Sequence, residues 1–145
     1  MPRDLGECML ATVLLVVSAA VLFTLGAIHL VITFVGPKLK PRDPALLARM
    51  REVSPGITGR ASMWDFWVGF NVSHSMAALL YGAIYGYLAI AHPDLLFSSV
   101  YLLTVGALTL AGLFVTGKIY WFRAPLIGIS VSLLCYVAGV AAALS

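Results

Sequence analysis

The chain has 145 residues, of which 61% are hydrophobic and only 10% are charged, and its formal net charge is +3. A soluble domain carries roughly 25% charged residues, so this chain has too few of them to cover a surface that faces water. Intrinsic disorder is excluded as well, because it requires few apolar residues and much charge. The composition therefore predicts an integral membrane protein with one domain.

Four apolar runs follow one another along the chain. Each is long enough to supply the ~20 residues with which a helix crosses a hydrocarbon core of about 30 Å. In that medium the backbone must satisfy its own hydrogen bonds, so each run is predicted to be a helix. We therefore predict an all-α fold, a bundle of four transmembrane helices. The predicted spans are residues 9–35, 63–91, 95–116 and 125–144.

Proline and glycine residues separate these spans. Gly36 and Pro37 end the first span, because proline cannot continue a helix. The sequence His92-Pro93-Asp94 predicts a tight turn between the second and third spans. Pro125 suits the first turn of the fourth helix.

The loop between the first two spans is long enough to form a helix of its own. Asp43 can cap that helix and Pro44 suits its first position, whereas Ser54-Pro55-Gly56 stops it. We predict a short interfacial helix that lies on the cytoplasmic headgroups. The alternative is a loop helix that packs on the inner end of the bundle. One face of this helix is apolar and comprises Leu46, Leu47, Met50 and Val53.

Basic residues are concentrated in two of the three loops. The second loop holds none, and the amino-terminal tail holds only Arg3. The positive-inside rule therefore places the first and third loops in the cytoplasm and both termini outside the cytoplasmic (inner) membrane. The same charges predict contacts with anionic lipid headgroups rather than with nucleic acid. The basic residues of these two loops are Lys38, Lys40, Arg42, Arg49, Arg51, Arg60, Lys118 and Arg123.

Few strongly polar side chains lie within the predicted spans, and such side chains are candidates for function. At about 100° per residue they form one stripe on each of the first two spans. We predict that the two stripes bury against each other and form a polar seam that binds a ligand. The residues of this predicted seam are His29, Thr33, Trp67, Asn71, His74 and Tyr81, and Ser18 extends the stripe on the first span.

Three interpretations of the seam stay open at this point. His29, Asn71 and His74 can form interhelical hydrogen bonds that hold the bundle together. The same side chains can instead line a pocket for a lipid, a quinone or another apolar ligand. Paired haem ligation by the two histidines is the third interpretation, and their different depths in the membrane oppose it. No cofactor is therefore predicted, and haem and quinone are kept as alternatives.

Two further groups of residues are given structural roles. Gly82 and Gly86 form a small-xxx-small spacing that lets another helix approach closely, and Ser75 lies beside them. Asp65 lies near the inner boundary of its span. An ion pair is predicted there between Asp65 and the basic residues Lys118 and Arg123.

The chain carries no recognisable catalytic or metal motif. Two histidines without a third ligand at the same depth do not complete the usual zinc set. Ser73 and Ser75 flank His74 in the sequence, but neighbours on a helix point away from one another. No catalytic residue and no metal ligand are predicted, and a function other than catalysis is favoured.

Three segments carry a resemblance to known proteins, namely Gly26-Ala27-Ile28-His29-Leu30, Gly69-Phe70-Asn71-Val72-Ser73-His74-Ser75 and Tyr120-Trp121-Phe122. They resemble segments of an uncharacterised family of small bacterial four-helix integral membrane proteins. In size and number of spans the chain is similar, more loosely, to the DoxX-like membrane proteins, some of which are linked to quinone redox chemistry. The resemblance implies a bacterial cytoplasmic membrane and no particular reaction, because a shared fold does not transfer an activity.

The sequence thus favours a small multi-pass membrane protein that binds a lipid or a protein partner through its polar seam and its basic first loop. Assembly into a homo-oligomer is compatible with this hypothesis. A quinone- or haem-associated redox component that uses His29 and His74 is the alternative hypothesis. A small dimeric transporter is the third.

Overall fold

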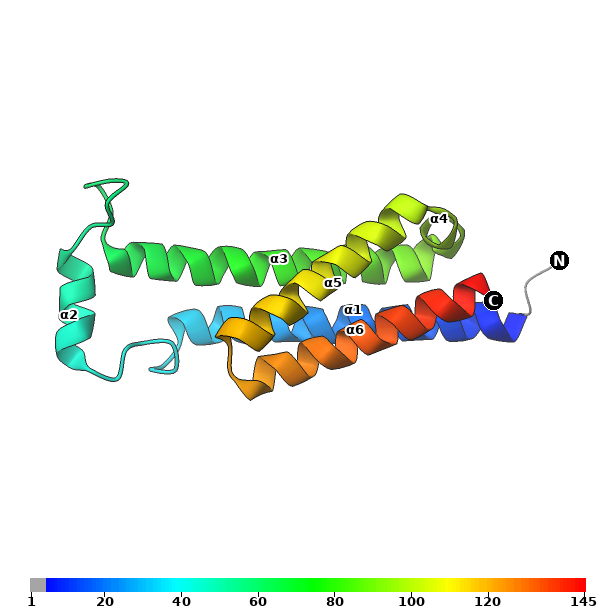
Figure 1. Ribbon diagram of the computed structural model, residues 1–145, viewed down its shortest axis with the longest axis horizontal. Coiled ribbons are helices and arrows are strands. Elements are labelled where there is room, and N and C mark those ends of the chain that lie inside the picture. The colour runs from blue at the N-terminus through cyan, green and yellow to red at the C-terminus, as the bar shows by residue number, and fades with distance from the viewer. Residues whose placement is uncertain (1–4) are drawn as a thin grey trace. The chain divides into compact units, whose positions relative to one another are not determined.

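The computed structural model describes residues 5–145, which form helices and no strands (Figure 1). Arg3, which contributed to the charge count of the amino-terminal tail, lies outside the described residues. Four of the helices are long and apolar enough to cross a membrane, namely α1, α3, α5 and α6. The all-α fold with four candidate spans is therefore confirmed. The helices are α1 (Leu5–Phe34), α2 (Pro44–Glu52), α3 (Met63–Ala91), α4 (Pro93–Ser98), α5 (Val100–Tyr120) and α6 (Arg123–Leu144).

The third span differs most from its predicted bounds. It was expected to begin at residue 95, but Pro93 starts the separate short helix α4, and α5 begins only at Val100. The Ser99 hydroxyl accepts a hydrogen bond from the backbone N–H of Leu102 at 3.3 Å and so caps α5. The predicted tight turn at residues 92–94 is wrong, because proline is well tolerated in the first turn of a helix and here it begins one.

The predicted helix of the first loop is present as α2. Gly36 follows the end of α1 with a φ of +83°, a conformation that glycine adopts without steric cost. The Asp43 carboxylate accepts a hydrogen bond from the backbone N–H of Ala45 at 2.8 Å, and Pro44 occupies the first position of α2. Figure 1 shows that α2 runs crosswise to the ends of α1 and α3 that it connects. We call residues 36–62 the basic loop.

Packing divides the chain into two compact units. Unit 1 comprises residues 5–25 and 78–145 of the described chain, and therefore contains the first part of α1, the last part of α3 and all of α4, α5 and α6. Unit 2 comprises residues 26–77, which are the end of α1, the basic loop with α2, and the first part of α3.

The hydrophobic core lies in unit 1. Leu15 and Leu22 of α1, Leu110 of α5 and Tyr136 of α6 are each at most 2% exposed. Leu96 of α4 is fully buried as well, which explains why this short helix packs against the rest of the unit instead of forming a loose turn. Burial of side chains of this kind stabilises a fold through dense packing.

Close helix approaches in unit 1 depend on glycine. A Cβ atom added at Gly82 would lie 2.6 Å from the Cβ of Phe23 and 2.7 Å from the backbone oxygen of Ala19, so α3 and α1 touch at this point. At Gly86 the nearest atom would be the Cβ of Ala19 at 3.6 Å, which is an ordinary contact. The close approach is therefore made at Gly82, whereas Gly86 leaves room for a side chain.

Four buried polar side chains of unit 1 are paired across helices. The Ser132 hydroxyl of α6 donates to the backbone oxygen of Ser18 at 2.9 Å, and the two hydroxyls lie 3.0 Å apart. The Tyr85 and Tyr136 hydroxyls donate to backbone oxygens of α5 at 2.7 and 2.8 Å. Ser18 was expected to belong to the polar seam, but its hydrogen-bond partner is on α6. Two small buried hydroxyls satisfy each other there, which removes the cost of burying either alone.

We predict that Gly82→Ala destabilises the protein by about 1–3 kcal/mol, because the new methyl group would overlap backbone and Cβ atoms that cannot move away. Gly112→Ala is the matched control, since an added Cβ there meets nothing within 4 Å. Its expected effect is an unchanged or slightly higher melting temperature, as alanine favours helix over glycine. Thermal unfolding in detergent measures both. Equal melting temperatures for the two variants would contradict the close approach at Gly82.

Candidate functional site

The polar side chains of unit 2 gather around Asn71 of α3, which is only 4% exposed. Its side-chain nitrogen Nδ2 donates to the backbone oxygen of Trp67 at 2.7 Å. Its oxygen Oδ1 lies 2.9 Å from Nε2 of His29 on α1. Because Nδ2 is held by the Trp67 carbonyl, Oδ1 faces the imidazole and can only accept, so Nε2 of His29 carries the proton and donates.

The two histidine rings meet next to this hydrogen bond. The rings of His29 and His74 are in edge contact, with their centroids 5.5 Å apart and their planes at 80°. Phe70 stacks on the other histidine, His74, with a centroid distance of 5.9 Å. A hydrogen bond thus brings together residues 42 positions apart in the sequence, and a ring contact joins His29 to a residue slightly farther along the chain. The structure therefore joins His29, Asn71 and His74 in one cluster, as the periodicity of the two spans predicts.

Two further hydroxyls of unit 2, one from the predicted seam and one beside it, bond to the backbone of their own helices. The Thr33 hydroxyl donates to the backbone oxygen of His29 at 2.7 Å, and the Ser75 hydroxyl donates to that of Asn71 at 2.8 Å. This back-bonding to the preceding turn satisfies a hydroxyl without a partner on another helix. Thr33 and Ser75 therefore act on their own helices, and neither hydroxyl completes the cluster around Asn71.

Tyr81 belongs to unit 1, so its predicted place in the seam stays a prediction. It stacks on Tyr85 with a centroid distance of 4.5 Å. It is 6% exposed, and its hydroxyl makes no hydrogen bond within the part of the chain that the structure describes.

The Asp65 carboxylate organises the start of α3. Its Oδ2 accepts hydrogen bonds from the backbone N–H and the hydroxyl of Ser62 at 2.9 and 2.7 Å. The Ser62 hydroxyl accepts in turn from the backbone N–H of Asp65 at 3.2 Å, which forms a reciprocal cap. Lys118 and Arg123 belong to unit 1, so their predicted ion pair with Asp65 stays a prediction.

A second feature of unit 2 is a hollow at the basic loop, which sequence reasoning missed. It has a volume of about 330 Å³. The Trp67 indole N–H donates to the backbone oxygen of Leu39 at 2.9 Å and thereby fastens the loop to α3. The signal that could have pointed to it is a tryptophan one turn into a span that follows a loop rich in lysine and arginine. The hollow is lined by Lys38, Leu39, Lys40, Pro41, Leu46, Met50 and Trp67.

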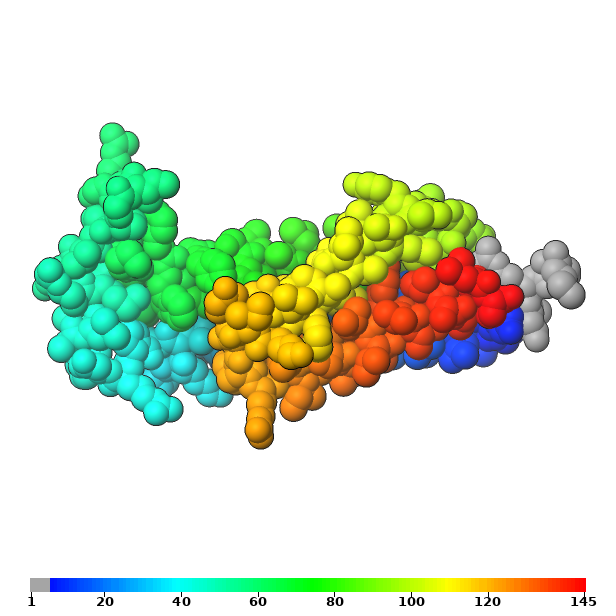
Figure 2. All heavy atoms as spheres, viewed as in Figure 1, coloured from blue at the N-terminus to red at the C-terminus, as the bar shows by residue number. Residues whose placement is uncertain are grey.

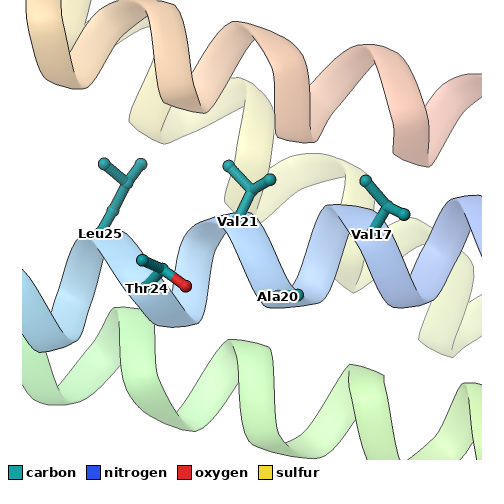
Figure 3. Close-up of a pocket in the computed structure, with 5 residues that line it drawn as sticks. All are labelled: Val17, Ala20, Val21, Thr24 and Leu25. Atoms are coloured by element: carbon teal, nitrogen blue, oxygen red, sulfur yellow. The ribbon is translucent and has the colours of Figure 1, made fainter.

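A hollow of about 350 Å³ on unit 1 has a different character (Figure 3). All of its lining residues come from α1, and Val17, Val21 and Leu25 extend toward the side on which α6 runs. Its one side-chain polar group is the hydroxyl of Thr24.

The histidine, cysteine and acidic side chains are the ones that bear on metal binding. Among residues 5–145, no three His, Cys, Asp or Glu side chains are grouped so that they could hold a metal ion. Cys8 and Cys135 are both free and half-buried. Haem and quinone binding by His29 and His74 stay alternatives, because the ring contact by itself does not select a ligand.

Fold and site together define an all-helical protein with four helices suited to a membrane, a histidine–asparagine cluster between two of them, and a basic loop. Comparisons with protein-family models, with curated proteins and with solved structures found no match for this chain. The resemblance of its segments to small bacterial four-helix membrane proteins therefore stays a prediction.

We predict that Asn71→Ala lowers stability by roughly 1–2 kcal/mol, because it removes the acceptor of His29 and leaves that N–H unpaired in an apolar setting. Ser73→Ala is the control on the same helix, since Ser73 is exposed and donates only to the backbone oxygen of Phe70. Thermal unfolding in detergent compares the two. A double-mutant cycle with His29→Ala should give a coupling energy of about 0.5–2 kcal/mol. A coupling energy of zero would show that the hydrogen bond contributes nothing.

Proposed function

We propose that the protein crosses a bilayer four times through α1, α3, α5 and α6. The exposed surface of these helices supports the proposal. In the most apolar window of each helix, at most 33% of the residues are buried inside the protein, so most of these residues are at least partly exposed. An apolar surface that extends over four helices is unfavourable in water, whereas hydrocarbon is a favourable surrounding for it.

In this proposal the basic loop lies in the cytoplasm and both termini lie outside the cytoplasmic membrane. Eight of the nine Lys and Arg residues fall in the basic loop or at the connection between α5 and α6. Loops rich in Lys and Arg remain on the cytoplasmic side during insertion. The resemblance to bacterial membrane proteins agrees with a cytoplasmic membrane.

We further propose that the protein binds anionic phospholipids at this membrane surface through the basic loop. The observation that carries this proposal is the exposure of α2, which has no buried residue although Leu46, Leu47 and Met50 lie on it. Figure 2 shows the atoms of α2 standing at the surface at one end of unit 2. A short helix with apolar and basic side chains, crosswise to two spans, suits the headgroup region of a bilayer.

The charge of the loop selects the kind of lipid. Residues 36–62 contain six basic and two acidic residues. Both acids are engaged: Asp43 caps α2, and Glu52 pairs with Arg49 at 3.3 Å. Lysine and arginine near an anionic surface each contribute about 1 kcal/mol to attraction. The loop therefore favours phosphatidylglycerol-type headgroups over zwitterionic ones. A protein partner at the same surface is the alternative outcome of the tests below.

The topology is tested by cysteine labelling in intact cells. In a background of Cys8→Ser and Cys135→Ser, we expect Ser145→Cys to react with an impermeant maleimide. Ile57→Cys, at a position that is 84% exposed in the basic loop, should react only after permeabilisation. The reverse pattern would invert the orientation. Extraction of the protein by buffer without detergent would overturn membrane insertion altogether.

Lipid selectivity is tested by native mass spectrometry of protein extracted from vesicles that contain equal amounts of phosphatidylglycerol and phosphatidylcholine. We expect bound phosphatidylglycerol to be enriched, and salt to reduce the enrichment during extraction because it screens exposed charges. A variant with Lys38, Lys40, Arg42 and Arg60 changed to Gln should lose the enrichment. Lys118→Gln with Arg123→Gln should keep it. Equal retention of both lipids by the unmodified protein would refute lipid selectivity and favour a protein partner.

A further inference from the structure

The hydrogen bond from Trp67 to Leu39 gives the start of the basic loop a fixed position on α3. The indole N–H reaches the Leu39 carbonyl over 2.9 Å, although the two residues are 28 positions apart. Lys38 and Lys40 flank that carbonyl on either side in the sequence, and both line the same hollow. The bond therefore fixes the stretch of backbone from which Lys38 and Lys40 extend.

These two lysines are not neutralised by the protein. Within residues 5–145 the one ion pair is Arg49 with Glu52, and it involves neither lysine. The loop's other acid, Asp43, is engaged at the start of α2. A lysine ammonium is a compact charge with three donors and is a common ligand of phosphate oxygens. The hollow thus has the charge that an anionic phosphate group requires.

The rest of the lining of the hollow is largely apolar, which restricts the ligand further. Leu46 and Met50 of α2 line it, and Leu46 is 51% exposed. A soluble phosphate compound gains nothing from an exposed leucine, whereas an amphipathic ligand covers it with hydrocarbon. The volume of about 330 Å³ lies at the low end of the range for small-molecule sites, roughly 300–1,000 Å³. It suits the headgroup and glycerol part of a lipid whose chains remain outside.

We propose that this hollow is a binding site for one anionic phospholipid. The phosphate lies between Lys38 and Lys40, the glycerol region lies against the Trp67 indole, and the acyl chains run over Leu46 and Met50. Basic pockets at the cytoplasmic end of membrane helices commonly hold lipid headgroups, and tryptophan favours that depth. The site rests on the lipid-binding function proposed above and assigns it to a particular place.

The test uses Trp67 as the reporter, in a chain with Trp64→Phe and Trp121→Phe so that Trp67 is the one remaining tryptophan. The protein is reconstituted into phosphatidylcholine vesicles that contain a small fraction of either brominated phosphatidylglycerol or brominated phosphatidylcholine. Bromine quenches indole fluorescence at short range. We expect stronger quenching by the anionic lipid at equal mole fraction, which gives its relative affinity for the site.

Lys38→Gln with Lys40→Gln should reduce that relative affinity by roughly fivefold for each lysine. Arg42→Gln with Arg60→Gln removes the same charge from the loop outside the hollow and should reduce it much less. Lys38→Arg with Lys40→Arg should keep it, and all variants are compared for melting temperature to show that they fold.

The possible outcomes distinguish the proposed lipid site from the lipid-binding function proposed for the whole basic loop. If the lysine and arginine pairs reduce the preference equally, the loop attracts anionic lipid through diffuse charge and the site is refuted, while the proposed function stands. If the protein with its lysines and arginines intact shows no preference for the anionic lipid, both the site and the function are refuted.

Discussion

The structure depends on one constraint, which is that a polar side chain on an apolar helix needs a hydrogen-bond partner inside the protein, and among the buried side chains of residues 5–145 the Tyr81 hydroxyl is the exception. Several hydroxyls meet it on their own helix: Thr109 donates to the Val105 carbonyl and Ser130 to that of Leu126. Polar contacts between helices are few, and the one between His29 and Asn71 uses both sides of the amide. An unpaired group of this kind is costly to bury, so these contacts specify which helix faces meet.

Features set by local chemistry could be predicted from the sequence. The helix α2 follows from Asp43 and Pro44, because a capping carboxylate and a proline at the first position act within one turn. The long helices follow from runs of apolar residues whose backbone has no other way to satisfy its hydrogen bonds. The meeting of His29 with Asn71 follows from helical periodicity, since rare polar residues on neighbouring spans are expected to face each other.

Features that depend on which elements become neighbours could not be predicted. Ser18 pairs with Ser132, 114 positions away, and periodicity alone does not tell which of three other helices lies beside a given face. The boundary at Ser99 could not be recognised in the sequence, because Leu95, Leu96 and Phe97 before it are as apolar as the helix that follows it. The bond between Trp67 and Leu39 uses a loop carbonyl, and every residue of the loop offers one, so the sequence does not single it out.

The histidine–asparagine cluster and the basic loop are parts of one arrangement within unit 2. Asn71 is bonded both to His29 and to the backbone of Trp67, one turn earlier on α3. The side chain of that same Trp67 holds Leu39. Hydrogen bonds therefore connect the end of α1 to the start of α3, and they connect the start of α3 to the loop that joins the two helices. The polar cluster has a structural role that requires no ligand, which is to fix these two helix ends. The basic loop with its lysines runs from one of these ends to the other.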